Sequence, residues 1–158
     1  MANEKQLKVA KEAYETLCST LDSMKFNYKR DDDKLMVFFG VSGEDIPMEF
    51  IVHCDADRQI IRLMSFLPFK MNEDKRIDGA VATCQVNYLL ADGSFDYNVG
   101  DGTIIFRMTS SFRASLVGTE LFKYMFQVAW STVDKYNDQF MMISKGNLSI
   151  ADFINNNS

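Results

Sequence analysis

Two runs with the alternation of β-strands lie on either side of Gly100-Asp101-Gly102. Apolar residues recur at every second position from Phe95 to Val99 and again from Ile104 to Met108, as in strands with one buried face. The two glycines supply the positive φ angles that a tight turn between twisted strands requires. The segment therefore predicts a β-hairpin. Because a strand and not a helix follows the glycines, they do not predict a phosphate-binding loop.

The same segment spaces its acids and amides almost as a calcium-binding loop does. An EF-hand loop needs oxygen ligands at its first, third and fifth positions, glycine at the sixth and glutamate at the twelfth. Counted from Asp96, the fifth position is Gly100, the sixth is Asp101 and the twelfth is Arg107. A cation thus stands where the metal needs its strongest anion, and the pattern does not predict a calcium site.

Alternation of apolar and polar residues predicts further strands before the hairpin. They cover residues 26–30, 35–41, 48–55 and 58–67, with Asp31-Asp32-Asp33 as a solvated turn between the first two. The run at 58–67 is apolar on both faces, which indicates either a central strand or a strand covered by a partner.

Three helices are predicted by apolar residues at three- and four-residue spacing. The first covers about residues 2–24, and the third runs from near Gly118 to about residue 144, where Gly146 can end it. The second begins after Asn72, whose side chain is suited to cap free N–H groups. Its expected buried stripe consists of Ile77, Ala80, Val81, Cys84 and Tyr88. The order of elements predicts an α+β fold in which an antiparallel sheet packs with helices.

The third helix is apolar around nearly its whole circumference between Leu121 and Val133. A helix of this kind must be covered on all sides, and one small sheet covers only one. We therefore predict that it binds a protein partner or a second copy of the chain, forming a homodimer. Ordinary core packing is the alternative. The predicted partner-binding residues are Leu121, Phe122, Met125, Phe126, Ala129 and Trp130.

Length and composition exclude several classes of protein. The 158 residues suit one domain, expected over 1–154 with a disordered tail at 155–158. The net charge of -5 opposes binding to nucleic acid, and no apolar run approaches the roughly 20 residues of a membrane span. The N-terminus lacks the pattern of a signal peptide. Three scattered cysteines, Cys18, Cys54 and Cys84, indicate buried free thiols in a reducing compartment, so a cytoplasmic protein is expected.

His53 is the only histidine, which limits the catalytic and metal chemistry available. His53, Asp55 and Asp57 would share a strand face and form a nominal metal-ligand set. A turn at Asp55-Ala56-Asp57-Arg58 would break that face, and one histidine cannot build a two-histidine site. A nucleophile would also need His53 as its base, and the neighbouring Cys54 points to the opposite face. We therefore expect no metal, no cofactor and no catalytic residues, and we expect that the protein is not an enzyme.

Four short segments resemble the YbjN family, whose members look like type III secretion chaperones in fold. They are Val86–Leu89, Gly93–Asp96, Asp101-Gly102 and the helix end Val133–Tyr136. The resemblance is clearest from about Ile60 to Gly146. It implies a small acidic bacterial domain in the order α-β-β-β-α-β-β-α, associated with sensory transduction regulation and without established catalytic residues. One departure is Val117, where the family pattern favours a polar residue, which leaves the helix cap to Ser115, Gly118 or Thr119.

The leading hypothesis is a non-enzymatic, cytosolic protein-binding module, chaperone-like or regulatory, that holds a partner segment on exposed apolar helix or strand surface. The alternatives are a small-ligand pocket between sheet and helices, and an enzyme whose dispersed site escapes sequence patterns. An exposed groove lined by Met and Phe would favour the first hypothesis. A closed pocket with convergent polar groups would favour the other two.

Overall fold

A single antiparallel sheet forms one layer of the molecule. The computed structural model describes all 158 residues, and its six strands are ordered β1-β2-β3-β4-β6-β5 across the sheet. Their bounds are β1 Tyr28–Asp31, β2 Met36–Val41, β3 Met48–Asp55, β4 Ile60–Lys70, β5 Ser94–Tyr97 and β6 Thr103–Ser111. The predicted hairpin is confirmed as β5 and β6. In its turn Gly102 has a φ of +78°, and its N–H donates to the Asn98 carbonyl at 2.7 Å. Gly100, which was also expected to supply a positive φ angle, does not have one.

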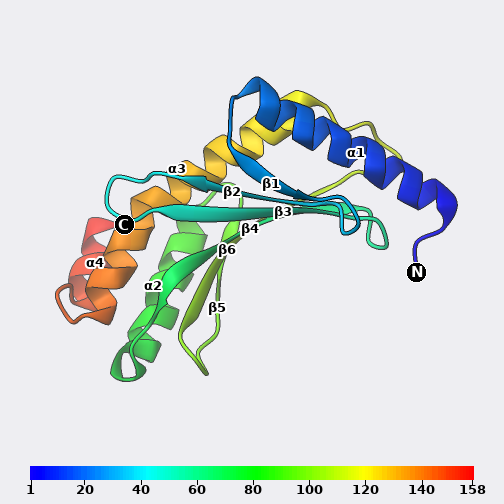
Figure 1. The fold of residues 1–158 in the computed structure, drawn as a ribbon. Helices are drawn as coiled ribbons and strands as arrows, with labels where there is room; N and C mark the ends of the chain where they lie inside the picture. The colour runs from blue at the N-terminus through cyan, green and yellow to red at the C-terminus, as the bar shows by residue number, and fades with distance from the viewer.

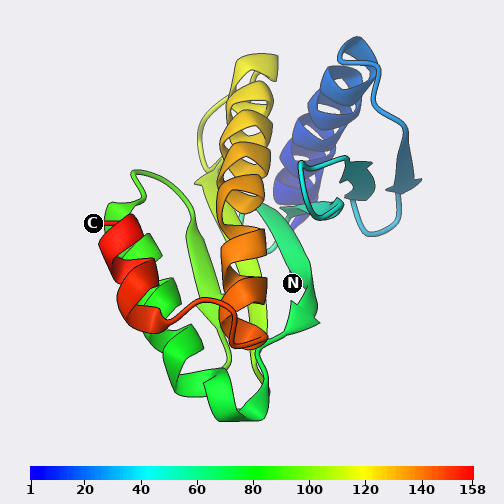
Figure 2. The same ribbon diagram turned by 90° about the vertical axis from the view of Figure 1, so that its left-hand side faces the viewer.

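The helices form a second layer on one face of the sheet (Figure 1). They are α1 Glu4–Ser23, α2 Arg76–Leu89 with a preceding 3-10 turn at Glu73–Lys75, α3 Thr119–Ser144 and α4 Ile150–Asn156. Figure 2 shows α3 in the middle of this layer, with α1 on one side and α2 and α4 on the other. The predicted α+β architecture is confirmed, with four strands between the first two helices and one further helix, α4, after α3.

Strand register places one row of apolar side chains under the helices. Val37 lies opposite Val52, Val52 opposite Leu63, and Leu63 opposite Met108, so the row crosses four strands. Aromatic side chains of α3 pack onto the same face. Phe126 contacts Phe39 with ring centroids 5.3 Å apart, and Phe140 contacts Phe95 at 5.1 Å. One cluster of 33 buried residues thus joins the sheet to all four helices.

The prediction for the buried face of α2 is wrong. Ile77, Val81, Cys84 and Tyr88 are exposed, whereas the buried residues are Gly79, Ala82, Thr83 and Val86. Small residues let the helix approach its neighbours closely: a Cβ on Gly79 would lie 2.7 Å from the Tyr97 hydroxyl oxygen. The prediction assumed that the larger apolar side chains face the core. For the same reason Cys84 is an exposed thiol, unlike Cys18 and Cys54, which are buried as expected.

The cap predicted for α2 is also absent. The Asn72 side chain makes no capping hydrogen bond. Its Nδ2 instead donates to the Ser144 carbonyl at 2.7 Å, and its backbone N–H donates to Ser144 Oγ at 2.9 Å. Asn72 therefore ties the chain after β4 to the end of α3. At the start of α3, Gly118 occupies the N-cap without a side-chain hydrogen bond.

Helix α4 runs to Asn156 and so enters the segment 155–158, for which the sequence predicts a disordered tail. Ser149 caps α4 by accepting a hydrogen bond from the Asp152 N–H. Phe153 is fully buried and packs against Phe140 of α3 at a centroid distance of 6.0 Å. Asn157 then donates through Nδ2 to Gln139 Oε1 at 2.9 Å. Disorder of the tail in solution stays a prediction.

Candidate functional site

The face of the sheet opposite the helices is uncovered, and it carries apolar side chains. Because side chains alternate along a strand, those between the core residues point to this open sheet face. Two of them are exposed and three are half-buried. We call this set the apolar patch: Phe38, Ile51, Met64, Phe66 and Ile105.

The strand register makes the apolar patch continuous. Phe38 lies opposite Ile51, and Ile51 lies opposite Met64, which forms one row across β2, β3 and β4. Phe66 lies opposite Ile105 in a second row across β4 and β6. Directly opposed side chains have Cβ atoms about 5 Å apart. Neighbouring members of the patch therefore contact one another and form one surface.

A surface hollow of about 680 Å³ lies beside the apolar patch. Phe38, Ile51 and Phe66 form part of its lining, and Lys29 and Glu49 supply charged groups. Gly40 also lines the hollow, on the same strand face as Phe38, and a Cβ there would meet only the Met48 carbonyl oxygen at 3.6 Å. The absence of a side chain at Gly40 thus leaves room for an apolar group from another molecule.

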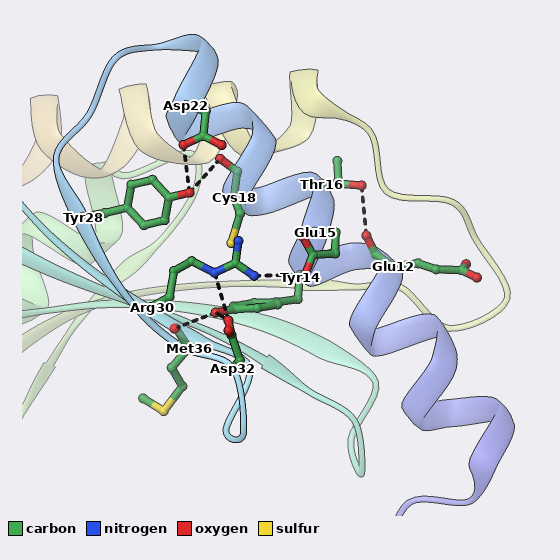
Figure 3. A network of polar contacts seen from close by, with 10 residues as sticks. All are labelled: Glu12, Tyr14, Glu15, Thr16, Cys18, Asp22, Tyr28, Arg30, Asp32 and Met36. Atoms are coloured by element: carbon green, nitrogen blue, oxygen red, sulfur yellow. Dashed lines mark hydrogen bonds and ion pairs between the residues drawn. The ribbon is translucent and has the colours of Figure 1, made fainter.

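A polar network fixes the edge strand β1 against α1 (Figure 3). The Tyr14 hydroxyl on α1 donates to Asp32 Oδ1 at 2.7 Å, and Arg30 Nε donates to the same oxygen at 2.9 Å. Arg30 Nη2 donates to Glu15 Oε1 at 3.0 Å, and its guanidinium lies 5.2 Å from the centre of the Tyr14 ring. The network therefore positions β1, and with it one side of the hollow.

Burial and hydrogen bonds shift the pKa values of four groups around this network. Burial, followed by the hydrogen bond to Asp32, raises the pKa of Tyr14. Burial and the hydrogen bond to Asp22 raise the pKa of Tyr28 to about 12. Burial also raises the pKa of the Cys18 thiol, whereas the hydrogen bond from Tyr14 lowers the pKa of Asp32. None of these four shifts moves a pKa towards neutrality, as general acid–base catalysis favours.

The predicted alternative of a metal set at His53, Asp55 and Asp57 is not assembled. Asp55 accepts hydrogen bonds from the Arg58 N–H, from Arg58 Nη1 and from Arg62 Nη2, at 2.9 to 3.2 Å. Burial opposes ionisation, but the two hydrogen bonds from Arg58 hold the pKa of Asp55 below its ordinary value. Asp57 is exposed and faces the chain's N-terminus. Burial lowers the pKa of His53, and no cluster of three or more metal-binding side chains is present.

The six residues predicted to bind a partner on α3 are mostly used inside the molecule. Four of them are buried in the core: Phe122, Met125, Phe126 and Ala129. Leu121 and Trp130 are half-buried, and Trp130 stacks on Phe26 with centroids 5.9 Å apart. The neighbouring helices α1 and α2 cover the flanks of α3, which the sequence argument did not include. Binding of a partner by these six residues stays a prediction.

Sequence reasoning did not identify the apolar patch as a site. One signal for it was present, because the strand at 58–67 was found to be apolar on both faces, with a covering partner as one explanation. The structure shows that β4 is central in the sheet and that its second face is open. The contributions of Phe38 and Gly40 depend on register with β3 and had no separate signal in the sequence.

Comparisons with known proteins support the fold. No family model matches the sequence, and no curated protein is significantly similar to it. A chain of the solved HopA1-SchA chaperone-effector complex superposes with a TM-score of 0.50 at 12% identity, over 82% of this chain and 94% of that one. The predicted likeness to the fold of type III secretion chaperones is thereby confirmed. None of the helices has the length and apolar character of a membrane span.

Proposed function

We propose that this protein is a non-enzymatic protein-binding module that holds a segment of a partner on its open sheet face. The observation that carries the proposal is the apolar patch on a face that no helix covers. The similarity in fold to a chain of a chaperone-effector complex supports a role in binding protein. A regulatory role and membership of the YbjN family stay predictions.

Physical chemistry favours a protein segment as the occupant of this face. Apolar surface contributes roughly 25 cal/mol per Å² when it is removed from water, and Phe66 alone leaves 48% of its surface exposed. Aromatic and methionine side chains are enriched at the centres of protein interfaces, and methionine adapts to varied partners. An extended segment laid across the strands would place one apolar side chain beside Gly40 and others on the apolar patch.

The hollow differs from the pocket that the small-ligand alternative requires. It lies on the outside of the sheet, whereas that alternative placed the pocket between sheet and helices. Its charged groups, Lys29 and Glu49, come from exposed strand positions, and the one lining residue with a shifted pKa is Tyr28, whose pKa burial raises to about 12. The hollow therefore suits an apolar side chain of a protein partner, with charged residues at the edge of the contact. It suits a small ligand held by convergent polar groups less well.

Filling the hollow tests the proposal. In Gly40→Ile, a branched side chain occupies the space that the partner's apolar group would take, at a strand position where such residues are favoured. The matched control is Thr109→Ile on β6, which adds an isoleucine to an exposed position of the same face outside the hollow. Thermal unfolding should show that both variants fold as the wild type does.

The readout is the set of proteins captured from lysate of the source cells and quantified by mass spectrometry. Proteins enriched by the wild type should be lost with Gly40→Ile and kept with Thr109→Ile. Equal capture by all three proteins would contradict the proposal, as would the absence of any enriched protein.

A further inference from the structure

Two charged side chains beside the hollow have no ion-pair partner within the molecule. Lys29 on β1 and Glu49 on β3 are both exposed, and both line the hollow next to the apolar patch. Neither of them forms an ion pair with another residue. Each charge is therefore free to meet a group of another molecule.

The other charged side chains that strand alternation places on this face are neutralised by neighbours. Burial lowers the pKa of His53, so this side chain is uncharged at neutral pH. The remaining charged residues form ion pairs: Arg107 with Asp96, Arg62 with Asp55, Asp31 with Lys34, and Lys70 with Asp101. The open sheet face thus presents one free positive charge and one free negative charge, and both lie at the hollow.

The strand register sets these two charges on either side of Gly40. Lys29 lies opposite Phe38, and Glu49 lies opposite Gly40, on the two strands that flank β2. Neighbouring strands are about 4.8 Å apart and rise about 3.4 Å per residue, so the Cα atoms of Lys29 and Glu49 are roughly 12 Å apart. The space above Gly40, into which no side chain projects, lies between them.

One extended segment can satisfy both charges at once. Alternate side chains of such a segment point to the same side and are about 7 Å apart, so two residues four positions apart span about 14 Å. The long side chains of Lys29 and Glu49 accommodate the small difference from 12 Å. An acid at one end then faces Lys29, a base at the other faces Glu49, and the residue halfway between them points at Gly40.

We propose that Lys29 and Glu49 select the segment that the open sheet face binds, an inference that rests on the proposed function. The preferred segment has an apolar residue, with an acidic residue two positions to one side of it and a basic residue two positions to the other. The apolar residue supplies affinity at the hollow, and the charges at its edge supply selectivity. A segment with two acids or two bases is rejected, because it brings like charges together at one end.

Selection from a displayed library of random nine-residue peptides tests this pattern. Peptides enriched by the wild-type protein should show the opposite charges at this spacing, in either chain direction. Lys29→Glu should enrich peptides with bases at both flanking positions, and Glu49→Lys should enrich peptides with acids at both. The matched control is Lys11→Glu, which makes the same change of net charge at an exposed position of α1 and should enrich the wild-type pattern.

Fluorescence anisotropy with one synthetic peptide from the wild-type selection measures direct contact. Lys29→Glu should weaken its binding by about 5- to 10-fold, because an attraction between exposed charges becomes a repulsion. Replacing the acid of the peptide by lysine should restore binding to Lys29→Glu and weaken binding to the wild type. Gly40→Ile should remove binding of the original peptide, since its side chain fills the space for the apolar residue.

The outcomes separate this inference from the proposed function. Peptides that are lost with Gly40→Ile, but that keep the same charges in Lys29→Glu and Glu49→Lys, would overturn the inference and leave the proposed function standing. Failure of the lysine-containing peptide to bind Lys29→Glu would overturn the inference as well. The absence of enriched peptides, or enrichment that Gly40→Ile does not change, would count against both.

Discussion

Helices α2 and α3 lie side by side on the sheet and distribute their apolar residues in opposite ways. α3 buries large side chains such as Phe122, Phe126 and Phe140. α2 buries Gly79, Ala82 and Val86 and exposes Ile77, Val81 and Tyr88. The spacing of apolar residues shows that each helix has an apolar face. It does not show which face turns inward, because that depends on the space left by the neighbouring elements.

The position of each helix in the layer explains the difference. α3 crosses the middle of the sheet, where neighbours on both flanks and the strands below provide a deep apolar environment for rings. α2 lies at the margin and is drawn close by Tyr97, whose hydroxyl donates to the Arg76 carbonyl at 2.8 Å. Glycine fits in that close contact at position 79, and the larger side chains of Ile77, Val81 and Tyr88 are turned outward.

A charge placed in each helix should produce the largest difference between them. Phe126→Asp puts an unpaired carboxylate among aromatic rings and should cost about 4 kcal/mol or more of the free energy of unfolding. Val81→Asp places the same group at an exposed position of α2 and should change that free energy by no more than about 0.5 kcal/mol. Urea unfolding measures both. Equal stability of the two variants would show that α3 is not the buried helix.

A single methyl group tests the close contact of α2. Alanine is normally favoured over glycine within a helix by about 1 kcal/mol. In Gly79→Ala, however, the new Cβ would lie 2.7 Å from the Tyr97 hydroxyl oxygen and 2.9 Å from Met71 Cγ. Overpacking of this kind costs about 1 to 3 kcal/mol, so we expect a net loss of about 1 kcal/mol in urea unfolding.

The control makes the opposite exchange, alanine to glycine, at the next position of α2. Ala80 is only half-buried, so Ala80→Gly should lose about 1 kcal/mol through helix propensity alone. Glycine would then be preferred at position 79 and alanine at position 80. If Gly79→Ala instead stabilises the protein, close packing is not the reason that α2 faces outward.

The elements that were predicted correctly are those determined by local chemistry. The β5–β6 hairpin follows from alternation and the glycines of its turn, and the extents of α1 and α3 follow from their apolar spacing. The errors concern contacts between distant residues. Asn72 bonds to Ser144 instead of capping α2, and Phe126 is covered in part by Phe39, far away in the sequence. The candidate site also depends on contacts between distant residues, because register between four strands assembles it.

Site-specific photo-crosslinking tests the central claim, that the open sheet face binds a protein partner, most directly. A photoreactive phenylalanine analogue would replace Phe66 on the sheet face or, as the matched control, Tyr124 on α3, since these aromatic residues are 48% and 50% exposed. After irradiation in the source cells, we predict crosslinks to partner proteins from position 66 and none from position 124. Crosslinks from position 124 alone, or from neither position, would contradict the claim.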